Sequence, residues 1–190
     1  MKFSPRPYQD TIIRHIIGTP RAMVWAGMGM GKTASALFAL DLLKRLGEDA
    51  FPALILAPLR VAQTTWPDEC LKWSNLELKL QPVVGSAKER RVSLKLPADA
   101  YTMNYENLPW LEKELGDRWP FKTVIADEST KLKSFRLGGG GGLRAKCLSH
   151  VAFTKVKRFV GLTGTPAPNG LEDLWGQYYF VDRGARLGRS

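Results

Sequence analysis

The chain has 190 residues, of which 44% are hydrophobic, so it can form one well-packed α/β domain but not two full domains. Its 28 Lys and Arg against 18 Asp and Glu give a net charge of +10, which favours a polyanionic partner without establishing one. Two distant cysteines and the lack of a membrane-length apolar stretch exclude a disulfide framework, a zinc site and a membrane span, so we expect a soluble, cytoplasmic protein.

The first element in chain order is a glycine-rich phosphate loop, residues 26–33, between a predicted strand at 23–25 and a predicted helix at 34–45. Glycines let backbone N–H groups turn toward an anion, Lys32 adds a charge for the β- and γ-phosphates, and the Thr33 hydroxyl can bind Mg²⁺. We therefore expect ATP and Mg²⁺ at this loop, although the strict pattern has Gly in place of Ala26. The predicted cofactor-binding residues of the loop are Gly27, Met28, Gly29, Met30, Gly31, Lys32 and Thr33.

Strand and helix patterns alternate through the rest of the chain. Apolar runs predict buried strands at 53–56, 78–84, 100–103, 123–126 and 158–162. Helical spacing predicts helices at 61–73, 106–115, 143–153 and 171–180. This alternation predicts an α/β domain, a three-layer sandwich with a mostly parallel central sheet flanked by helices, with ligands at the carboxyl ends of the strands. Five consecutive glycines at 138–142 predict a flexible surface loop.

Two adjacent carboxylates, Asp127 and Glu128, follow the predicted strand at 123–126. Such a pair is costly at a strand end unless a cation meets it, although a solvent-facing strand end is the alternative. In phosphate-loop ATPases the first acid supports Mg²⁺, and a second one beside it orients or deprotonates the attacking water. We therefore predict Lys32, Asp127 and Glu128 as catalytic residues and Thr33 and Asp127 as metal ligands.

The segment 161–170 turns tightly from a predicted strand into a helix. Its two hydroxyl side chains, Thr163 and Thr165, are placed to sense the γ-phosphate and to relay its loss. By spacing alone, an ordinary turn is the alternative.

Taken in order, these motifs resemble the first RecA-like domain of a superfamily-two helicase-type motor. The resemblance is specifically to the Swi/Snf-type ATPases, including their small bacteriophage members, and it covers nearly the whole chain. The segments that carry it are Arg6-Pro7-Tyr8-Gln9, the loop 26–33, Leu56-Ala57-Pro58-Leu59, Thr102-Met103-Asn104-Tyr105-Glu106, the acid pair, and 162–169 with Leu174-Trp175. Each segment is moderately specific, and six in order are highly specific.

The resemblance implies a RecA-like ATP-binding domain of a DNA translocase or helicase that couples Mg-ATP hydrolysis to movement on DNA. It implies that Gln9, with Arg6, reads adenine. It also implies that two strand-end loops touch the DNA backbone, with Arg60, Asn104 and Tyr105 as candidate contacts. Duplex DNA is the preferred track by resemblance, and strand separation is not implied.

Two departures from the family pattern stand out. The family usually has a histidine two residues after the acid pair, where this chain has Thr130, so coupling toward Thr163 would pass to the threonine hydroxyl. The family's motor also has a second RecA-like domain whose arginines complete the ATP site, and this chain ends soon after Trp175. We therefore expect residues 1–190 to be one N-terminal domain of a longer protein. If it is encoded by a phage, it would act in the cytoplasm of the bacterial host.

Two alternatives remain open from the sequence. A nucleotide-gated DNA-binding module with little activity of its own would share the same loops, although an intact Glu128 argues against lost hydrolysis. A phosphate-loop kinase would transfer the γ-phosphoryl group to a small acceptor, although the acid pair and the lack of a recognisable acceptor lid argue against it. Whether the product phosphate is free or acceptor-bound separates a kinase from an ATPase.

Overall fold

A single parallel sheet organises the computed structural model, which describes residues 1–136 and 142–188. The strands within these residues are β1 (Arg21–Trp25), β2 (Ala53–Ala57), β3 (Leu80–Pro82), β4 (Ala100–Asn104), β5 (Thr123–Asp127) and β6 (Arg158–Thr163). They lie in the order β1-β6-β5-β2-β4-β3, and every neighbouring pair is parallel. The carboxyl ends of all these strands therefore meet at one edge of the sheet.

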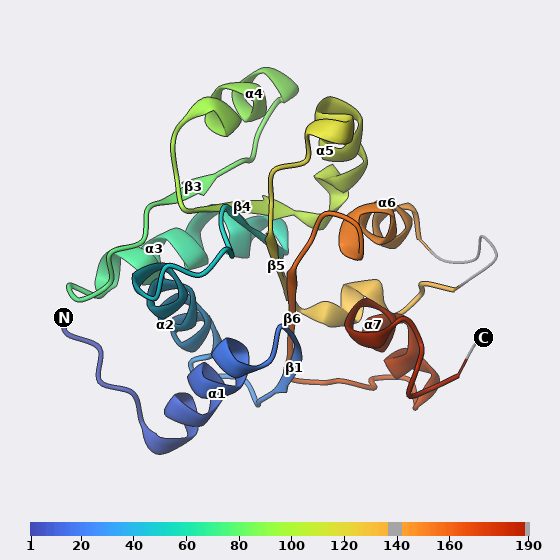
Figure 1. The fold of residues 1–190 in the computed structure, drawn as a ribbon, viewed down its shortest axis with the longest axis horizontal. Helices are drawn as coiled ribbons and strands as arrows, with labels where there is room; N and C mark the ends of the chain where they lie inside the picture. The colour runs from blue at the N-terminus through green and yellow to red at the C-terminus, as the bar shows by residue number, and fades with distance from the viewer. Residues whose placement is uncertain (137–141, 189–190) are drawn as a thin grey trace.

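Helices cover both faces of the sheet, which gives three layers (Figure 1). One face carries α1 (Pro7–Gly18), α2 (Lys32–Arg45) and α3 (Trp66–Lys72), and the other carries α5 (Leu108–Leu115), α6 (Leu143–Ala152) and α7 (Glu172–Asp182). Helix α4 (Ala87–Lys95) lies beside β3 at one end of the sheet. The short turns are the π turn η1 (Val61–Thr65) and the 3₁₀ turns η2 (Tyr105–Asn107), η3 (Gly116–Arg118) and η4 (Ser129–Leu132).

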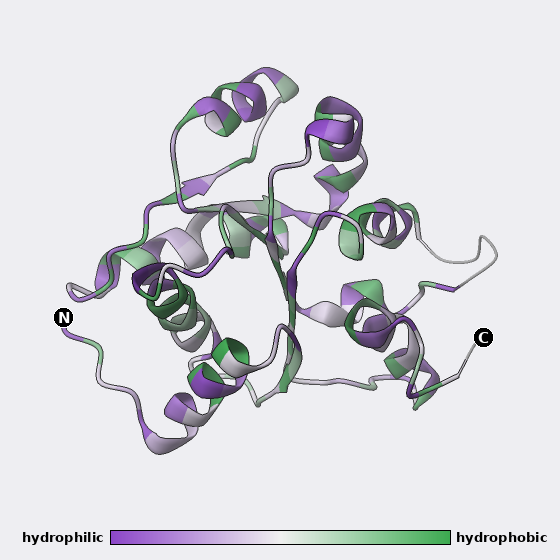
Figure 2. Ribbon diagram, in the orientation of Figure 1, coloured by the Kyte–Doolittle hydropathy of each residue, from purple (hydrophilic) through white to green (hydrophobic). Residues whose placement is uncertain are grey.

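Two hydrophobic clusters, one on each face, hold the layers together. In β2, Leu54 and Leu56 belong to the cluster under α5, α6 and α7, whereas Ile55 belongs to the cluster under α1, α2 and α3. Figure 2 shows this as hydrophobic colouring along the central strands and along α2. Because a parallel sheet is covered on both faces, its strands are continuous apolar runs without strict alternation. Such runs can be recognised in the sequence.

The structure confirms the predicted α/β fold, and its sheet is entirely parallel within the described residues. The helix predicted at 61–73 divides into η1 and α3, with Pro67 in the first turn of α3. Helices α1 and α4 were not predicted. Of the glycine loop predicted at 138–142, residues 138–141 lie outside the described residues, and Gly142 directly precedes α6. None of the helices in 1–136 and 142–188 is long and apolar enough to cross a bilayer.

Candidate active site

Three predicted site segments follow three neighbouring strands. The phosphate loop follows β1, the threonine loop (residues 163–171) follows β6, and the acid loop (residues 127–136) follows β5. Since β6 pairs with both β1 and β5, the threonine loop lies between the other two. Arg60 follows β2, and Asn104 ends β4, farther along the same edge. The sheet order thus brings together segments that are more than one hundred residues apart in the chain.

The phosphate loop has the backbone geometry of an anion cradle. Gly29 and Gly31 have φ of 76° and 69°, a region that side-chain-bearing residues rarely adopt. Gly31 precedes α2, whose N-terminus begins at Lys32 and carries a partial positive charge. The Lys32 ammonium donates to the carbonyl oxygens of Ala26, at 2.6 Å, and Gly27, at 2.9 Å. The loop therefore presents glycine backbone, a helix N-terminus and a cation at one point, which fits a phosphate group.

The threonine loop packs directly on the phosphate loop. The Ala26 backbone N–H donates to the carbonyl oxygen of Thr163, at 3.2 Å. A Cβ placed on Gly164 would lie 3.5 Å from the Ala26 oxygen, so the two backbones are nearly in contact. The Thr163 hydroxyl accepts from the Thr165 N–H at 3.1 Å, and it is buried, whereas Thr165 is exposed. Moving either loop would therefore strain the hydrogen bond and the backbone contact between the two loops.

Asp127 is a buried carboxylate at the end of β5, with 9% of the residue exposed. Its Oδ2 accepts from the indole N–H of Trp66 at 2.9 Å, and its Oδ1 accepts from the Glu128 N–H at 3.1 Å. Burial raises the pKa of the Asp127 carboxyl above its usual value, and the hydrogen bond from Trp66 opposes that rise. Nearby Glu128 raises this pKa further, and Lys32 lowers it. A desolvated carboxylate of this kind suits a cation ligand, because a divalent ion would restore the charge balance.

Glu128 differs from its neighbour in both exposure and backbone. Its side chain is exposed, and its φ of 55° lies in the left-handed region, which is uncommon for a residue with a Cβ. Such strained residues cluster at functional sites, where the surrounding structure holds them in place. The acid pair thus consists of one fixed, buried carboxylate and one exposed carboxylate at the same strand end.

The candidate adenine-binding residues Arg6 and Gln9 line a small cavity beside the phosphate loop. Gln9 Oε1 accepts from the Arg6 N–H at 2.9 Å, and Gln9 Nε2 lies only 2.3 Å from where a Cβ on Gly31 would be. The cavity has a volume of about 280 Å³, and its lining also includes Tyr8 and Trp73. Gln9, in the first turn of α1, and the phosphate loop, which follows β1, are therefore adjacent in space.

The residues predicted to touch DNA differ in their surroundings. Arg60 is exposed at the start of η1. Tyr105 is only 1% exposed, and its hydroxyl donates to the Asp127 carbonyl oxygen at 2.8 Å. Asn104 is also buried, and its amide bonds with the side chains of Glu106 and Asn107. Their burial and internal hydrogen bonds weigh against direct contact of Tyr105 and Asn104 with DNA, and this contact stays a prediction to be tested.

Three residues of the site were missed by sequence reasoning. Trp66 is fully buried, as helical spacing over 61–73 indicates, and its indole N–H also orients Asp127. Ser129 and Gln177 hydrogen-bond to each other below the acid pair. Thr130, the predicted coupling residue, is half-buried in η4, and its neighbour Ser129 makes the side-chain bond toward α7. No local pattern could have indicated these pairs, because their members are far apart in sequence.

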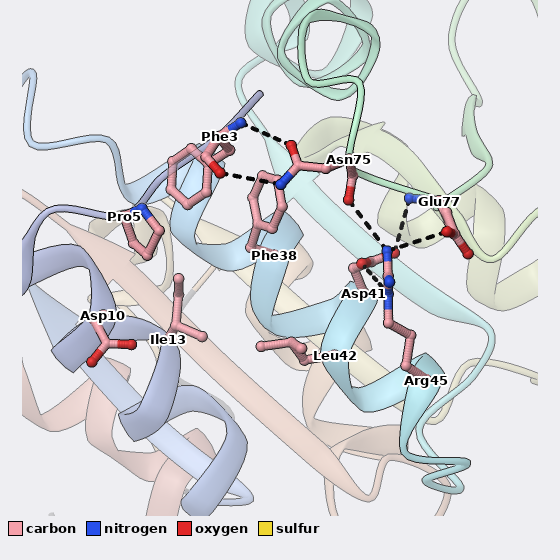
Figure 3. Close-up of a pocket in the computed structure, with 10 residues that line it drawn as sticks. All are labelled: Phe3, Pro5, Asp10, Ile13, Phe38, Asp41, Leu42, Arg45, Asn75 and Glu77. Atoms are coloured by element: carbon pink, nitrogen blue, oxygen red, sulfur yellow. Dashed lines mark hydrogen bonds and ion pairs between the residues drawn. The ribbon is translucent and has the colours of Figure 1, made fainter. Parts of the chain in front are cut away.

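Another cavity, of about 370 Å³, lies between α1 and α2 and contains none of the predicted site residues (Figure 3). Most of its polar groups already bond to one another. Arg45 donates to Asp41 at 2.8 Å, and the Asn75 amide bonds both ways with the backbone of Phe3. With the bonds from Arg45 to the Asn75 carbonyl oxygen and from the Glu77 N–H to Asp41, they tie the N-terminal segment and α2 to the loop before β3. We therefore assign this cavity no part in the candidate active site.

Comparison with known proteins gives a family match over most of the chain. The model of the SNF2-related domain matches residues 21–185. Protein p41 of Acyrthosiphon pisum secondary endosymbiont phage 1 is 59% identical over 99% of this chain and 41% of its own length. Protein CHROMATIN REMODELING 19 of Arabidopsis thaliana is 28% identical over 93% of this chain and 25% of its own length. The chain thus spans less than half the length of these relatives.

Among solved structures, the SWI2/SNF2 ATPase core of Sulfolobus solfataricus in complex with dsDNA shares the fold. The match covers 97% of this chain and 37% of that one, with 23% identity and a TM-score of 0.74. At this identity the likeness concerns the fold alone, and it confirms the predicted RecA-like architecture. Since the family model spans most of the chain and the phage relative matches nearly all of it, the chain belongs to the SNF2-related domain family.

Proposed function

We propose that the chain is the ATP-binding half of a DNA-dependent ATPase motor, a Swi/Snf-like translocase that couples Mg-ATP hydrolysis to movement on DNA. The observation that carries this proposal is the convergence of the phosphate, threonine and acid loops on three adjacent strands, with the Ala26–Thr163 hydrogen bond joining the first two. Family membership supports it, and weighs against the kinase alternative.

Binding of ATP would use the phosphate loop and the neighbouring cavity. Lys32 and the loop N–H groups would hold the β- and γ-phosphates, since the Lys32 ammonium lies at the loop, where its hydrogen bonds are to two backbone carbonyl oxygens. Gln9 and Arg6 would meet adenine in the cavity that borders Gly31. The base and phosphate sites would thus be fixed relative to each other by the contact between Gln9 and the loop.

The donor set fits a Mg²⁺ ion. Thr33 is the second residue of α2 and directly follows Lys32, whose charge lowers the pKa of the buried Asp127 carboxyl. When bound, Mg²⁺ would supply positive charge that offsets the negative charge of the transferred phosphoryl group. Trp66 would keep Asp127 in one orientation toward the ion. The exposed Glu128 carboxylate would orient or deprotonate the attacking water.

Movement on DNA requires contact with the nucleic acid and a partner domain. We propose that Arg60 contacts a backbone phosphate of duplex DNA, since it is exposed at the same sheet edge as the ATP site. We also propose that a second RecA-like domain supplies arginines to the ATP site, because the chain spans only 41% of its phage relative. Thr163, Thr165 and Thr130 would couple hydrolysis to DNA contact.

The first prediction separates nucleotide binding from hydrolysis. Lys32→Ala should weaken Mg-ATP binding roughly 10- to 100-fold, since a charge-assisted contact contributes about 1.5–3 kcal/mol. Glu128→Gln should leave affinity unchanged and lower turnover by roughly 10²–10⁴, because it removes a general base. Fluorescent-nucleotide titration and phosphate release measure the two effects. Normal turnover in Glu128→Gln would exclude Glu128 from the chemical step.

The second prediction concerns the DNA surface. Arg60→Ala should weaken binding to duplex DNA of any sequence and reduce the log–log salt slope by about 0.9, the value for one phosphate contact. Arg118→Ala is the matched control, since this exposed arginine lies in η3, before β5 and at the opposite edge of the sheet. Fluorescence anisotropy over a salt series measures both. An equal loss in the two variants would contradict a localised surface.

The third prediction tests the internal role of Tyr105. Tyr105→Phe should lower the free energy of unfolding by about 1–3 kcal/mol, because it leaves the buried Asp127 carbonyl without its donor. Its affinity for duplex DNA should equal that of the unsubstituted chain. Urea unfolding and anisotropy are the two measurements. Lost DNA affinity with normal stability would indicate that Tyr105 contacts DNA.

The fourth prediction concerns the second domain. The 190-residue chain should bind nucleotide but hydrolyse it slowly. A longer protein with the second RecA-like domain should turn over ATP faster by roughly 10³–10⁵, the effect of an arginine finger in related hydrolases, and should respond to DNA. Steady-state phosphate release with and without duplex DNA compares the two. Equal rates with equal DNA stimulation would rule out a two-lobed motor.

A further inference from the structure

One side chain of α7 joins the acid loop to the threonine loop. The Ser129 hydroxyl donates to Gln177 Oε1 at 2.8 Å, and Gln177 Nε2 donates to the Pro166 carbonyl oxygen at 2.7 Å. The same nitrogen donates to the Asp173 carbonyl oxygen at 2.9 Å, within the first turn of α7. Both Ser129 and Gln177 are 0% exposed. A single buried amide therefore bridges the loop that carries the acid pair and the loop that carries Thr163 and Thr165.

The chemistry of the bridge makes it stiff. A glutamine amide has two N–H donors, and both are engaged, while its oxygen accepts from a hydroxyl. Water does not reach this position, so a bond broken by moving one loop would not be replaced by solvent. If Ser129 shifts, the Gln177 amide must therefore shift with it or lose a hydrogen bond. Because the nitrogen of the same amide bonds the Pro166 carbonyl oxygen, the shift also reaches Pro166.

The backbones of α7 and η4 also lie close together beside the bridge. A Cβ placed on Gly176 would lie 2.5 Å from the Lys133 carbonyl oxygen and 2.7 Å from that of Leu132. Only a glycine lets α7 approach η4 at this distance. The Lys133 ammonium also pairs with Asp173 Oδ2 at 3.2 Å, and the same oxygen accepts from the Asn169 N–H at 2.8 Å. The first turns of α7 are thus fastened to both loops by contacts independent of Gln177.

The bridge begins and ends beside functional residues. Ser129 directly follows Glu128, whose backbone is held in the left-handed region. Pro166 directly follows Thr165, whose N–H donates to the Thr163 hydroxyl. The two partners of Gln177 therefore neighbour Glu128 on the acid loop and Thr165 on the threonine loop, the residues proposed to act at the γ-phosphate.

We propose that Gln177 is a positioning residue that holds the acid and threonine loops in register, so that a change at Glu128 reaches Thr163 and Thr165 through Ser129 and α7. The Ser129–Gln177 pair thus acts together with Thr130 in the proposed coupling. The inference rests on the proposed function, because it concerns how nucleotide state passes from one loop to the next.

The test compares Ser129→Ala, Gln177→Met and the double variant with the unsubstituted chain. Ser149→Ala and Gln81→Met are matched controls, since Ser149 bonds within α6 and Gln81 bonds its neighbour in β3. Hydrogen exchange of residues 127–136 and 163–171 is measured with Mg-ADP and with a non-hydrolysable Mg-ATP analogue. Thermal unfolding identifies folded variants, and Ser129→Ala, which removes one oxygen atom, is the milder change.

We expect each single variant to bind both nucleotides within about 2-fold of the unsubstituted chain and to keep the nucleotide-dependent exchange of 127–136. The nucleotide-dependent difference at 163–171 should fall by roughly 5-fold or more. The double variant should be no worse than either single one, since both remove the same connection. The controls should behave as the unsubstituted chain.

Three results would overturn the bridge: a normal exchange difference at 163–171 in both single variants, additive losses in the double variant, or no nucleotide response at 163–171 in the unsubstituted chain. Failure of the proposed function has a separate readout. It would appear as absent DNA-stimulated ATP turnover in the two-domain protein, whatever the exchange of the two loops shows.

Discussion

The desolvated carboxylate of Asp127 is the constraint on which the site depends. Three parts of the chain converge on this one residue: Trp66 from α3 and the N–H of Glu128 bond the carboxylate, and Tyr105 from η2 bonds its carbonyl oxygen. A buried charge with these few partners is costly, and burial accordingly raises its pKa. A cation bound at Asp127 would offset that cost, which is consistent with the Mg²⁺ site proposed here.

The sequence predicted the parts of this protein whose signal is local. Apolar runs indicate the strands because both faces of a parallel sheet are buried, and the phosphate loop and acid pair are recognisable because their residues are contiguous. The capping box of Ser86 and Glu89 is likewise a local signal for the start of α4. Likewise, Pro7 in the first turn marks the start of α1.

The supporting contacts could not be predicted, because they depend on which strands become neighbours. Trp66 and Asp127 are 61 residues apart, and Ser129 and Gln177 are 48 apart. Periodicity correctly indicates that Trp66 packs inside, but it does not show that the indole N–H meets a carboxylate. The same limit applies to Tyr105, because only the order of β5, β2 and β4 brings its hydroxyl to the Asp127 carbonyl oxygen.

The different roles proposed for the two acids fit these contacts. Asp127, the proposed metal ligand, is hydrogen-bonded by three donors, whereas Glu128 is exposed and its backbone lies in the left-handed region. An exposed carboxylate sits in high dielectric, where it interacts weakly with a developing charge. Closing the site with a second domain would exclude water around Glu128 and strengthen every charge interaction there. Hydrolysis would then depend on domain closure, and the joined acid and threonine loops would carry that event along the sheet edge toward Arg60.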